Sequence, residues 1–507
     1  MRVIYNTCVA DPWALVAKKL KEDYGYEPVY WVGYEGAFDN SGDIIPRMFP
    51  NVIFQSFWDA WKGIFPTIIK EEYSKNYIDI DFLRNFSLHE LLALKMMDRM
   101  DYDRYSFNFM ERERHFLNLV KYWSAVISVT KPDVVISAVL PHRVYDYVLY
   151  ALCKYHNIKY VCFQYTLCNE RVFAVPDIFS IGNIFDNDYK NFLTINIEKN
   201  ELPEEVLNVF EKVKSDYSIA RPSYMRTHDV MDKKASRLTF LVKRFLNHPI
   251  SNGFMKKGIH ATYYKNKKYS IEETHFSLLE YTLKKKKTFK QNKYIKKHYD
   301  SLTSLLSYDV PYIIFFPHYQ PEATTSPGGD IFVNQKLCIE TLLKNTPDNF
   351  YIYYKEHPNQ FMSHMEGHTS RIKEYYDDLV SDPRVKLVPF EIDSYTLIKN
   401  AKAVSTVTGT VGWEAMVQQK PVIIFGIIWY EKYSGVLRVT DDTSASKITT
   451  FIENYKYDEQ DLLAYLLSFT KNTVRAYHYV DLKNQVNIDE QECVDNLVKE
   501  VLRVSNL

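Results

Sequence analysis

Four consecutive residues, Lys355-Glu356-His357-Pro358, bring a cation, a carboxylate and an imidazole to one point of the chain. They follow Tyr351–Tyr354, four β-forming residues that predict a strand, so the polar side chains would lie at its carboxyl end. Pro358 fixes its own φ and biases His357 toward an extended backbone. Lysine and imidazole N–H groups held in this way can stabilise negative charge that develops in a reaction. The ordinary alternative is a surface histidine without a special role.

A second polar segment, Thr408-Gly409-Thr410, separates two apolar runs about fifty residues later. Residues 403–407 are small or β-branched, as in a buried parallel strand, and residues 411–418 resume with helical spacing. Residues 422–425 then form another apolar strand. In such a unit, backbone N–H groups and two hydroxyls gather at the start of a helix, where they favour a phosphate. The alternative is an ordinary strand-helix-strand crossover in which a threonine only caps the helix.

The residues between these two segments alternate between helical and strand patterns. Residues 371–380 and 394–400 have helical spacing, and residues 385–388 form an apolar strand between them. Successive β/α units of this kind place the carboxyl ends of their strands at one edge of a parallel sheet. The histidine motif and the threonine-glycine turn are therefore predicted to lie at the same edge.

A third polar segment, residues 317–329, follows an apolar strand predicted at residues 312–316. The segment is long, polar and bracketed by prolines, which suits a cleft between domains better than a minimal turn. Its binding candidates are His318, Gln320, Glu322 and Thr325. The alternative is that the prolines only rigidify a surface loop.

Three motifs in this order carry a family resemblance: FFPHYQPEATTSP at residues 315–327, KEHP, and TVTGTVGWEAMVQQKPVIIFG at residues 406–426. Together they resemble the capsule polysaccharide biosynthesis proteins, which include transferases of Kdo and related ulosonic acids. The resemblance covers roughly residues 311–435 and is weak in the first half of the chain. It implies a two-domain, GT-B-like architecture in which this half binds a CMP-activated sugar.

The resemblance also implies roles for particular residues. The nucleotide would be bound by Lys355, His357, Pro358, Thr408, Gly409 and Thr410, with His318, Gln320, Glu322 and Thr325 as further candidates. Glu414 would accept hydrogen bonds from ribose hydroxyls, or would only complement the helix N-terminus. CMP leaves with a single phosphate, so lysine, histidine, hydroxyl and amide donors can stabilise its charge without a metal. We therefore expect the CMP-sugar as donor substrate, and no metal or other cofactor.

Residues 1–186 read as a first α/β domain on the acceptor side. Strands are expected at residues 2–5, 28–32, 51–54, 133–138, 159–163 and 179–181, and helices at residues 116–129 and 147–155. A Pro-His-Arg-Val-Tyr-Asp turn, residues 141–146, follows one of these strands. His142 or Asp146 could deprotonate an acceptor hydroxyl while Arg143 holds an anionic sugar. The alternative is an ordinary (i, i+3) helix pair between Arg143 and Asp146.

Composition limits the class of protein. The chain has 507 residues and zero formal net charge, with 25% charged and 46% hydrophobic residues, which is typical of folded domains and excludes a strongly basic nucleic-acid binder. The six cysteines are scattered without a metal-ligand pair and are expected to be reduced core thiols of a cytosolic protein. No secretory leader is evident, and no apolar run approaches the ~20 residues that span a bilayer.

Two charged features lie outside the three motifs. The Asp-x-Asp pairs Asp79/Asp81, Asp101/Asp103 and Asp186/Asp188 could hold a divalent cation on a diphosphate, but such pairs are common by chance. Residues 187–308 are rich in lysine and predict a helical connecting region with a solvated basic face. Its functional alternative is attraction to an anionic membrane or to an acidic polysaccharide.

The sequence thus predicts an α/β protein with two doubly wound domains facing a cleft. Residues 309–475 form the nucleotide-sugar domain, and residues 476–507 form helices that cross back to the first domain. The predicted activity is transfer of an acidic sugar, Kdo or a nonulosonic acid, from CMP to a glycan or lipid-linked glycan, with no nucleic-acid partner. The alternatives are a UDP-sugar transferase or epimerase, and a non-catalytic component of capsule assembly or export. A peripheral position at the inner face of the plasma membrane is also possible.

Overall fold

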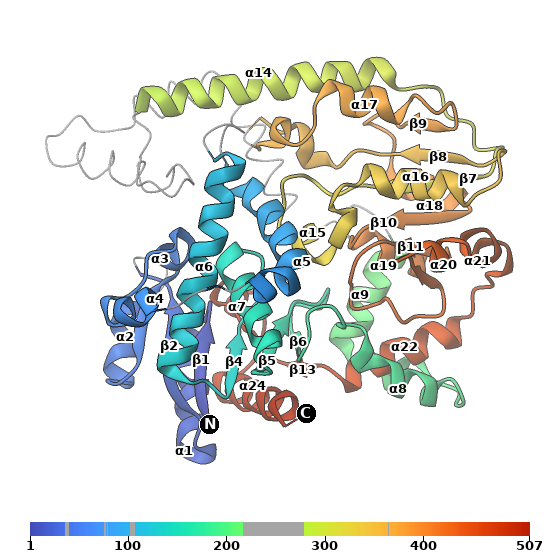
Figure 1. Cartoon of the computed structure of the whole chain (residues 1–507). Coiled ribbons are helices and arrows are strands. Elements are labelled where there is room, and N and C mark those ends of the chain that lie inside the picture. The colour runs from blue at the N-terminus through green and yellow to red at the C-terminus, as the bar shows by residue number, and fades with distance from the viewer. Residues whose placement is uncertain are drawn as a thin grey trace, which may run out of the picture.

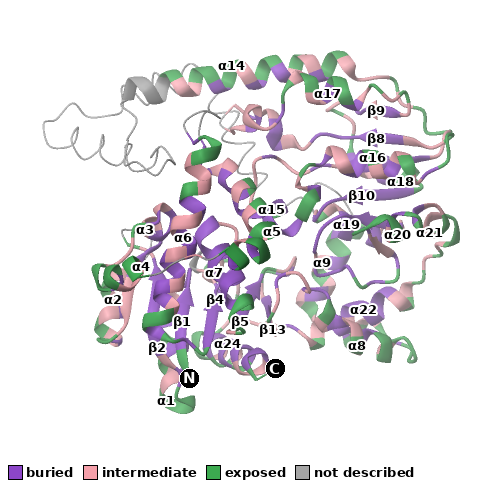
Figure 2. Ribbon diagram, in the orientation of Figure 1, coloured by how far each residue is buried: buried purple, intermediate pink, exposed green. Residues whose placement is uncertain are grey.

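The chain folds around two α/β sheets that lie side by side (Figure 1). The computed structural model describes residues 1–35, 40–75, 78, 80–101, 107–215, 278–363 and 365–506. Most strands of both sheets are buried, whereas the outer faces of the surrounding helices are exposed (Figure 2). The predicted fold class, two doubly wound α/β domains, is confirmed by these two sheets.

The first sheet has seven strands in the order β13-β6-β5-β4-β1-β2-β3. They are β1 (Arg2–Asn6), β2 (Glu27–Gly33), β3 (Ile53–Ser56), β4 (Val134–Ser137), β5 (Lys159–Gln164), β6 (Arg171–Val175) and β13 (Val474–Arg475). β1 to β5 are parallel, and β6 runs antiparallel to both β5 and β13. The chain reverses its direction of winding at the β1/β4 pair, as doubly wound sheets do.

Helices cover both faces of the first sheet. On one face lie α1 (Ala10–Tyr24), α2 (Ser41–Met48) and α24 (Glu490–Ser505); on the other lie α3 (Phe57–Lys62), α5 (Ile80–Met96), α6 (Phe109–Thr130) and α7 (Val144–Tyr155), with α4 (Lys70–Lys75) against α6. Alternate residues of β1 serve the two faces: Tyr5 belongs to the core under α1, and Ile4 to the core under α6. Both faces are apolar because both are covered.

The second sheet is entirely parallel, in the order β12-β11-β10-β7-β8-β9. Its strands are β7 (Tyr312–Phe316), β8 (Tyr351–Tyr354), β9 (Val385–Leu387), β10 (Ala403–Thr406), β11 (Val422–Ile424) and β12 (Val436–Arg438). In order of appearance along the chain this is 3-2-1-4-5-6, the Rossmann arrangement, with the switch point between β7 and β10. The strands predicted from the three motifs are β7, β8, β9, β10 and β11, each within one or two residues.

Helices also cover both faces of the second sheet. One face carries α14 (Leu278–Leu302), α16 (Lys336–Lys344), α17 (Lys373–Leu379), α20 (Asp442–Ala445) and α21 (Ile448–Asn454); the other carries α9 (Glu204–Ser215), α18 (Ser394–Asn400) and α19 (Val411–Val417). α8 (Asn183–Phe192) packs against α22 (Glu459–Lys471), and the short helices α15 (Thr325–Gly328) and α23 (Val480–Lys483) complete the described part.

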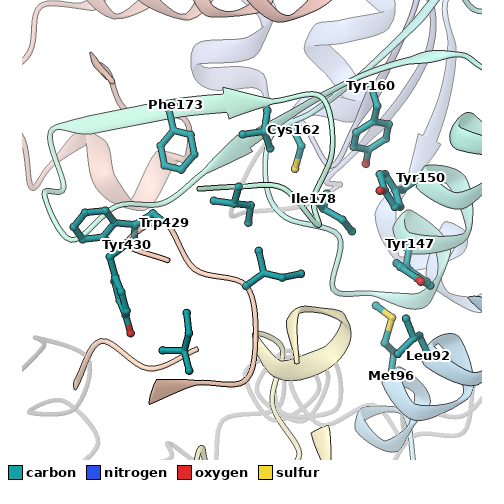
Figure 3. Close-up of a cluster of buried hydrophobic side chains, with 14 of the residues drawn as sticks. Leu92, Met96, Tyr147, Tyr150, Tyr160, Cys162, Phe173, Ile178, Trp429 and Tyr430 are labelled. Carbon is teal, nitrogen blue, oxygen red and sulfur yellow. The ribbon is translucent and has the colours of Figure 1, made fainter. Parts of the chain in front are cut away.

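The two domains share one apolar core. Figure 3 shows Phe173 of β6, Tyr147 of α7 and Trp429, from the loop after β11, in a single cluster of buried side chains. The Trp429 ring lies 4.9 Å from Phe469 of α22 and 6.5 Å from Phe185 of α8, measured between centroids. Burial of this shared cluster holds the second domain against the first.

One predicted strand is wrong, and three strands were not predicted. Residues 179–181 form a turn, in which the carboxylate of Asp177 accepts the N–H of Phe179 at 2.8 Å, while Ile178 and Ile181 are buried. The segment was misread as a strand because a buried turn can have the same mostly apolar composition. The unpredicted strands are β6 and the two-residue β13, which pair with each other, and β12, which pairs with β11.

The chain ends on the first domain, where α24 contacts α1 and the strands β5, β6 and β13. Of the lysine-rich region, α9 packs on α19 and α14 lies on the second sheet, whereas residues 216–277, with Lys233 to Lys268, lie outside the described residues. All six cysteines are buried and unpaired, as predicted. Within the described ranges, no helix is long and apolar enough to cross a bilayer.

Replacing Trp429 with alanine should lower the free energy of unfolding by about 3–5 kcal/mol, because removal of a buried indole leaves a cavity between the domains. Phe109→Ala is the control, since that ring is 65% exposed on α6 and its loss should cost less than about 0.5 kcal/mol. Urea unfolding followed by circular dichroism gives both values. Equal destabilisation by the two substitutions would contradict the shared core.

Candidate active site

A cavity of about 710 Å³ opens at the carboxyl edge of the second sheet. Its walls are the loops that follow β7, β8, β9 and β10, so it contains the switch point where α/β sheets of this kind bind ligands. Nine of the predicted binding residues line it: His318, Glu322, Lys355, His357, Pro358, Thr408, Gly409, Thr410 and Glu414. The three motifs therefore meet at one edge, as predicted from their positions after strands.

His318 joins the loops after β7 and β10. The N–H of Thr408 donates to Nε2 of His318 at 3.0 Å, so the ring proton of this imidazole resides on Nδ1. Nδ1 lies 3.0 Å from the carboxylate of Glu322 and donates to it. Burial favours a higher pKa for Glu322, but His318 and the hydroxyl of Thr324 outweigh it and hold the pKa below its ordinary value. Glu322 is thus a negative charge in the cavity wall.

Glu356, the carboxylate of the histidine motif, borders the cavity but is bound by side chains inside the domain. Its side chain is fully buried and accepts from Arg371 Nε at 3.2 Å, Tyr376 at 2.7 Å and Tyr354 at 3.0 Å. Its other oxygen accepts the N–H of His357 at 2.8 Å. A buried carboxylate with four donors is satisfied, and it anchors the loop that carries the neighbouring lysine and histidine.

His357 has the extended backbone that the following proline predicts, with φ −66° and ψ 134°. The N–H of Asn359 donates to its Nδ1 at 3.1 Å, which places the ring proton on Nε2. Lys355 donates to the carbonyl of Phe390 at 3.1 Å, and burial lowers the pKa of its ammonium to about 8. The ammonium is therefore charged at neutral pH but readily perturbed, as expected of a binding-site cation.

The threonine-glycine turn is held from two sides. Thr406 donates to the carbonyl of Phe316 at 3.0 Å, and a Cβ on Gly409 would lie 2.6 Å from that threonine hydroxyl. Gly409 is thus required by a close approach, not by a left-handed backbone. Tyr430 donates to the carbonyl of Gly409. Thr410 precedes α19 and makes no side-chain cap, so its hydroxyl is not used in the way that the crossover alternative requires.

Glu414 lies one helical turn into α19 and lines the cavity with only 7% of its surface exposed. Burial raises the pKa of this carboxyl to about 7. Such a group is poised between a neutral donor and a charged acceptor of hydrogen bonds at neutral pH. A ligand hydroxyl could form a hydrogen bond with either the neutral or the charged carboxyl.

Gln320 and Thr325 were predicted to bind the ligand, but they do not line the cavity. The Gln320 amide donates to the Thr325 hydroxyl at 2.6 Å, and its backbone N–H donates to Gln360 at 3.0 Å. Both side chains are buried. They shape the proline-bracketed loop, and their predicted binding role stays a prediction.

The predicted acceptor-side residues lie in the first domain, at the turn between β4 and α7, and do not line the cavity. Asp146 is buried and accepts the N–H groups of His142 at 3.1 Å and Arg143 at 2.7 Å. Burial raises the pKa of Asp146 to about 7, although Arg143 and these N–H groups oppose it. His142 contacts the carbonyl of Leu140 through Nδ1 at 2.7 Å, and burial lowers its pKa well below the ordinary value.

Several lining residues were not predicted: Lys296, Thr406, Phe390, Glu391 and Asp393. Residues 390–393 lie in the loop after β9. The rule that ligands bind at the carboxyl ends of parallel strands, which indicated the histidine motif, could therefore have indicated these residues too. Lys296 comes from α14, about sixty residues before the motif, and no local pattern indicates its approach. Its Nζ lies 5.3 Å from the ring centroid of Phe390, and Lys355 lies 5.8 Å from the same centroid.

The Asp-x-Asp pairs are engaged in ion pairs. Asp81 lies 3.4 Å from Arg84, Asp101 3.1 Å from Arg112, Asp186 2.6 Å from Lys190 and Asp188 2.6 Å from Lys471, whereas Asp79 and Asp103 lie outside the described residues. Among the residues that the structure describes, no three His, Cys, Asp or Glu side chains cluster in a way that could hold a metal ion. Metal-free chemistry remains a prediction of the sequence.

Residues 324–477 match the family model "Capsule polysaccharide biosynthesis protein". The resemblance that the motifs indicated is thereby confirmed over this part of the chain. Two curated relatives are the capsule polysaccharide modification proteins LipA of Neisseria meningitidis serogroups A and B, each 30% identical, over 136 and 115 residues. These matches cover 27% and 23% of this chain but only 18% and 15% of the relatives, so the chain spans under a fifth of their length.

Solved structures that align with this chain include the KpsC β-Kdo 2,7-transferase of Thermosulfurimonas dismutans, at 13% identity and a TM-score of 0.33, covering 75% of this chain and 89% of that one. The UDP-GlcNAc 2-epimerase of Neisseria meningitidis aligns at 13% identity and a TM-score of 0.23, covering 99% of each chain. These overlaps are too loose to carry an argument, and the fold assignment rests on the two sheets of the chain itself.

Glu414→Gln should raise the free energy of unfolding at pH 8 by up to about 3 kcal/mol and leave it unchanged near pH 4. Because burial raises the folded-state pKa above the ordinary 4.5, the favourable contribution of the neutral carboxyl is complete below pH 4.5 and lost as the pH rises through 7. Gln keeps the neutral shape at every pH. Thermal unfolding from pH 4 to 9 measures this, with Glu391→Gln, an exposed residue of the same cavity, as control. An equal change in the free energy of unfolding at every pH would contradict the raised pKa of the Glu414 carboxyl.

Proposed function

We propose that the protein is a glycosyltransferase that moves an acidic sugar, Kdo or a nonulosonic acid, from a CMP donor to a surface glycan or a lipid-linked glycan. The observation that carries the proposal is the cavity at the β7/β10 switch point, where two lysines, two histidines and four threonines converge. Its volume of about 710 Å³ lies in the usual range of small-ligand sites. The family match of residues 324–477 supports a role in capsule polysaccharide biosynthesis.

In the proposed mechanism, CMP is the leaving group and its phosphate gains charge as the glycosidic bond breaks. Nε2–H of His357, the Lys355 ammonium and the hydroxyls of Thr408 and Thr410 are the donors that stabilise this charge. Because Lys355 is held by Phe390 and His357 by Asn359, these donors need no reorganisation when the bond breaks. Glu414 is the proposed partner of the ribose hydroxyls.

The acceptor hydroxyl must lose a proton, and Asp146 is the proposed base on the first domain. A carboxyl with a pKa of about 7 suits a general base at neutral pH. The competing account is a purely structural Asp146, since both its oxygens accept backbone N–H groups at the start of α7. Inverting and retaining chemistry would both use a carboxylate here, as base or as nucleophile.

Two other classes of function compete with this proposal. A UDP-sugar transferase or epimerase would use the same switch point, and a non-catalytic component of capsule assembly or export would bind nucleotide without turnover. Thermal unfolding with CMP and with UDP distinguishes a CMP-dependent from a UDP-dependent enzyme, because only a nucleotide that binds the folded protein stabilises it. Nucleotide release from a panel of CMP- and UDP-sugars distinguishes an enzyme from a non-catalytic component. The proposed location is the cytoplasm, with peripheral contact at the inner face of the plasma membrane.

His357→Ala should slow sugar transfer by ~10²-fold or more, because one preorganised donor to the departing phosphate is lost. The protein should stay folded, since the imidazole is at the cavity wall and not in the core. His298→Ala, on α14 and outside the cavity lining, is the matched control and should transfer at the parent rate. Initial rates of CMP release, with melting temperatures of each variant, give the comparison. Parent-rate transfer by His357→Ala would remove this residue from the site.

Asp146→Asn should keep CMP affinity and lose transfer by at least ~10²-fold if the carboxylate is the base. The amide can still accept through its oxygen, so the turn at the start of α7 loses only one of two acceptors. CMP affinity, product and melting temperature are measured on one preparation. A variant that unfolds earlier but transfers normally when folded would make Asp146 structural, and His142 would be tested next.

A further inference from the structure

Helix α14 runs along the outer edge of the second domain, with one face buried and one face open to solvent (Figures 1 and 2). Hydrogen bonds from the buried face fix the rotation of α14 about its axis. Asn292 donates to the carbonyls of Met362 at 2.7 Å and Met365 at 2.8 Å, and Tyr299 donates to the carbonyl of Val388 at 2.6 Å. The direction of the outward face is therefore fixed by the fold.

The outward face carries a cluster of lysines, which we call the basic face: Lys286, Lys287, Lys290, Lys293 and Lys297. At about 100° per residue, they fall within an arc of roughly 120° on the helix. All five are exposed, and none is in an ion pair with a described residue. By contrast, Lys284 and Lys296 on the flanks are paired with Glu366 at 2.6 Å and Asp300 at 2.7 Å.

This arrangement does not stabilise the helix. The spacings between Lys286 and Lys290, and between Lys293 and Lys297, are (i, i+4), at which like charges repel and destabilise a helix. The whole chain has zero net charge, so the basic face is a local excess and not a consequence of a basic protein. A local cationic surface of this kind attracts polyanions and anionic surfaces.

Large apolar side chains lie among these lysines. Leu283 is 55% exposed, Tyr294 59% and Phe289 43%. The first two fall inside the arc of the basic face, and Phe289 lies about 40° outside it, by the same helical spacing. Ile372, beside the start of α17, adds another side chain that is 44% exposed. Lysines and exposed apolar side chains thus share one face of α14; the long lysine side chains can reach headgroups while the apolar side chains lie at the level below them.

We propose that the basic face of α14 docks on the surface of a bilayer that contains anionic phospholipids. The lysines contact the headgroups, and Leu283, Phe289 and Tyr294 enter the boundary between headgroups and acyl chains. An acidic polysaccharide would satisfy the lysines but would leave these apolar side chains in water. Because Lys296 of the same helix lines the cavity, docking through α14 holds the cavity beside the membrane.

The test is sedimentation of the full chain with vesicles of phosphatidylcholine alone and of phosphatidylcholine with phosphatidylglycerol. The parent protein should bind only the anionic vesicles, and less at high salt. Lys286→Glu/Lys290→Glu/Lys293→Glu should weaken this binding by at least about 100-fold. The matched control reverses three exposed, unpaired lysines elsewhere among the described residues, Lys399, Lys447 and Lys456, and should bind nearly as the parent does. Melting temperatures confirm that each variant is folded.

A second variant, Leu283→Ser/Phe289→Ser/Tyr294→Ser, distinguishes binding to a lipid surface from binding to any polyanion. It should lose most vesicle binding while still binding soluble polyglutamate through the unchanged lysines. The proposal is overturned if the parent does not bind anionic vesicles, or if the α14 lysine variant binds them as the parent does. It is also overturned if the serine variant keeps full vesicle binding, because the basic face would then recognise polyanions only. None of these outcomes depends on the donor sugar or on transfer activity.

Discussion

The fully buried carboxylate of Glu356 is the interaction on which the candidate site depends. It receives Arg371, two tyrosine hydroxyls and the N–H of His357. Arg371 in turn reaches the carbonyl of His318 at 3.3 Å and the side chain of Gln335 at 3.4 Å. Gln335 accepts the N–H of His318 at 2.9 Å, and His318 accepts the N–H of Thr408. One buried ion pair thus ties together the loops after β8, β7 and β10.

A buried ion pair of this kind contributes little to net stability, since desolvation offsets much of the attraction. Removing one partner, however, leaves an uncompensated buried charge and costs about 3–5 kcal/mol. The network therefore specifies one arrangement of the three loops more than it stabilises the fold. The consequence is that His357, Lys355 and the threonine turn are presented to the cavity without further rearrangement, which electrostatic catalysis requires.

Local patterns predicted much of this organisation. Strand and helix periodicities located the parallel strands, and the rule that ligands bind at carboxyl ends brought nine predicted residues to one cavity. Pro358 predicted the extended backbone at His357 correctly. The turn at residues 179–181 was misread as a strand, because its apolar residues pack into the shared core, as in the ring contact of Phe179 with Tyr150, without pairing in a sheet.

Other features depend on contacts between distant segments and left no local signal. Glu356 reads as one more polar residue in KEHP, and only Arg371, Tyr354 and Tyr376 around it make it an anchor. Gln320 and Thr325 belong to the polar loop but bond to each other. Lys296 reaches the cavity from a helix that reads only as lysine-rich. The family match is confined to residues 324–477, which agrees with the greater clarity of motifs in that half.

We propose that the cavity between the loops after β7, β8 and β10 binds CMP through its phosphate, and a crystal structure of the full chain with CMP would show whether it does. We expect the phosphate within hydrogen-bond distance of His357 Nε2 and of the Thr408 or Thr410 hydroxyl, with the ribose toward Glu414. CMP bound elsewhere, or in the cavity with its phosphate turned away from His357 and the threonine-glycine turn, would rule out this binding mode.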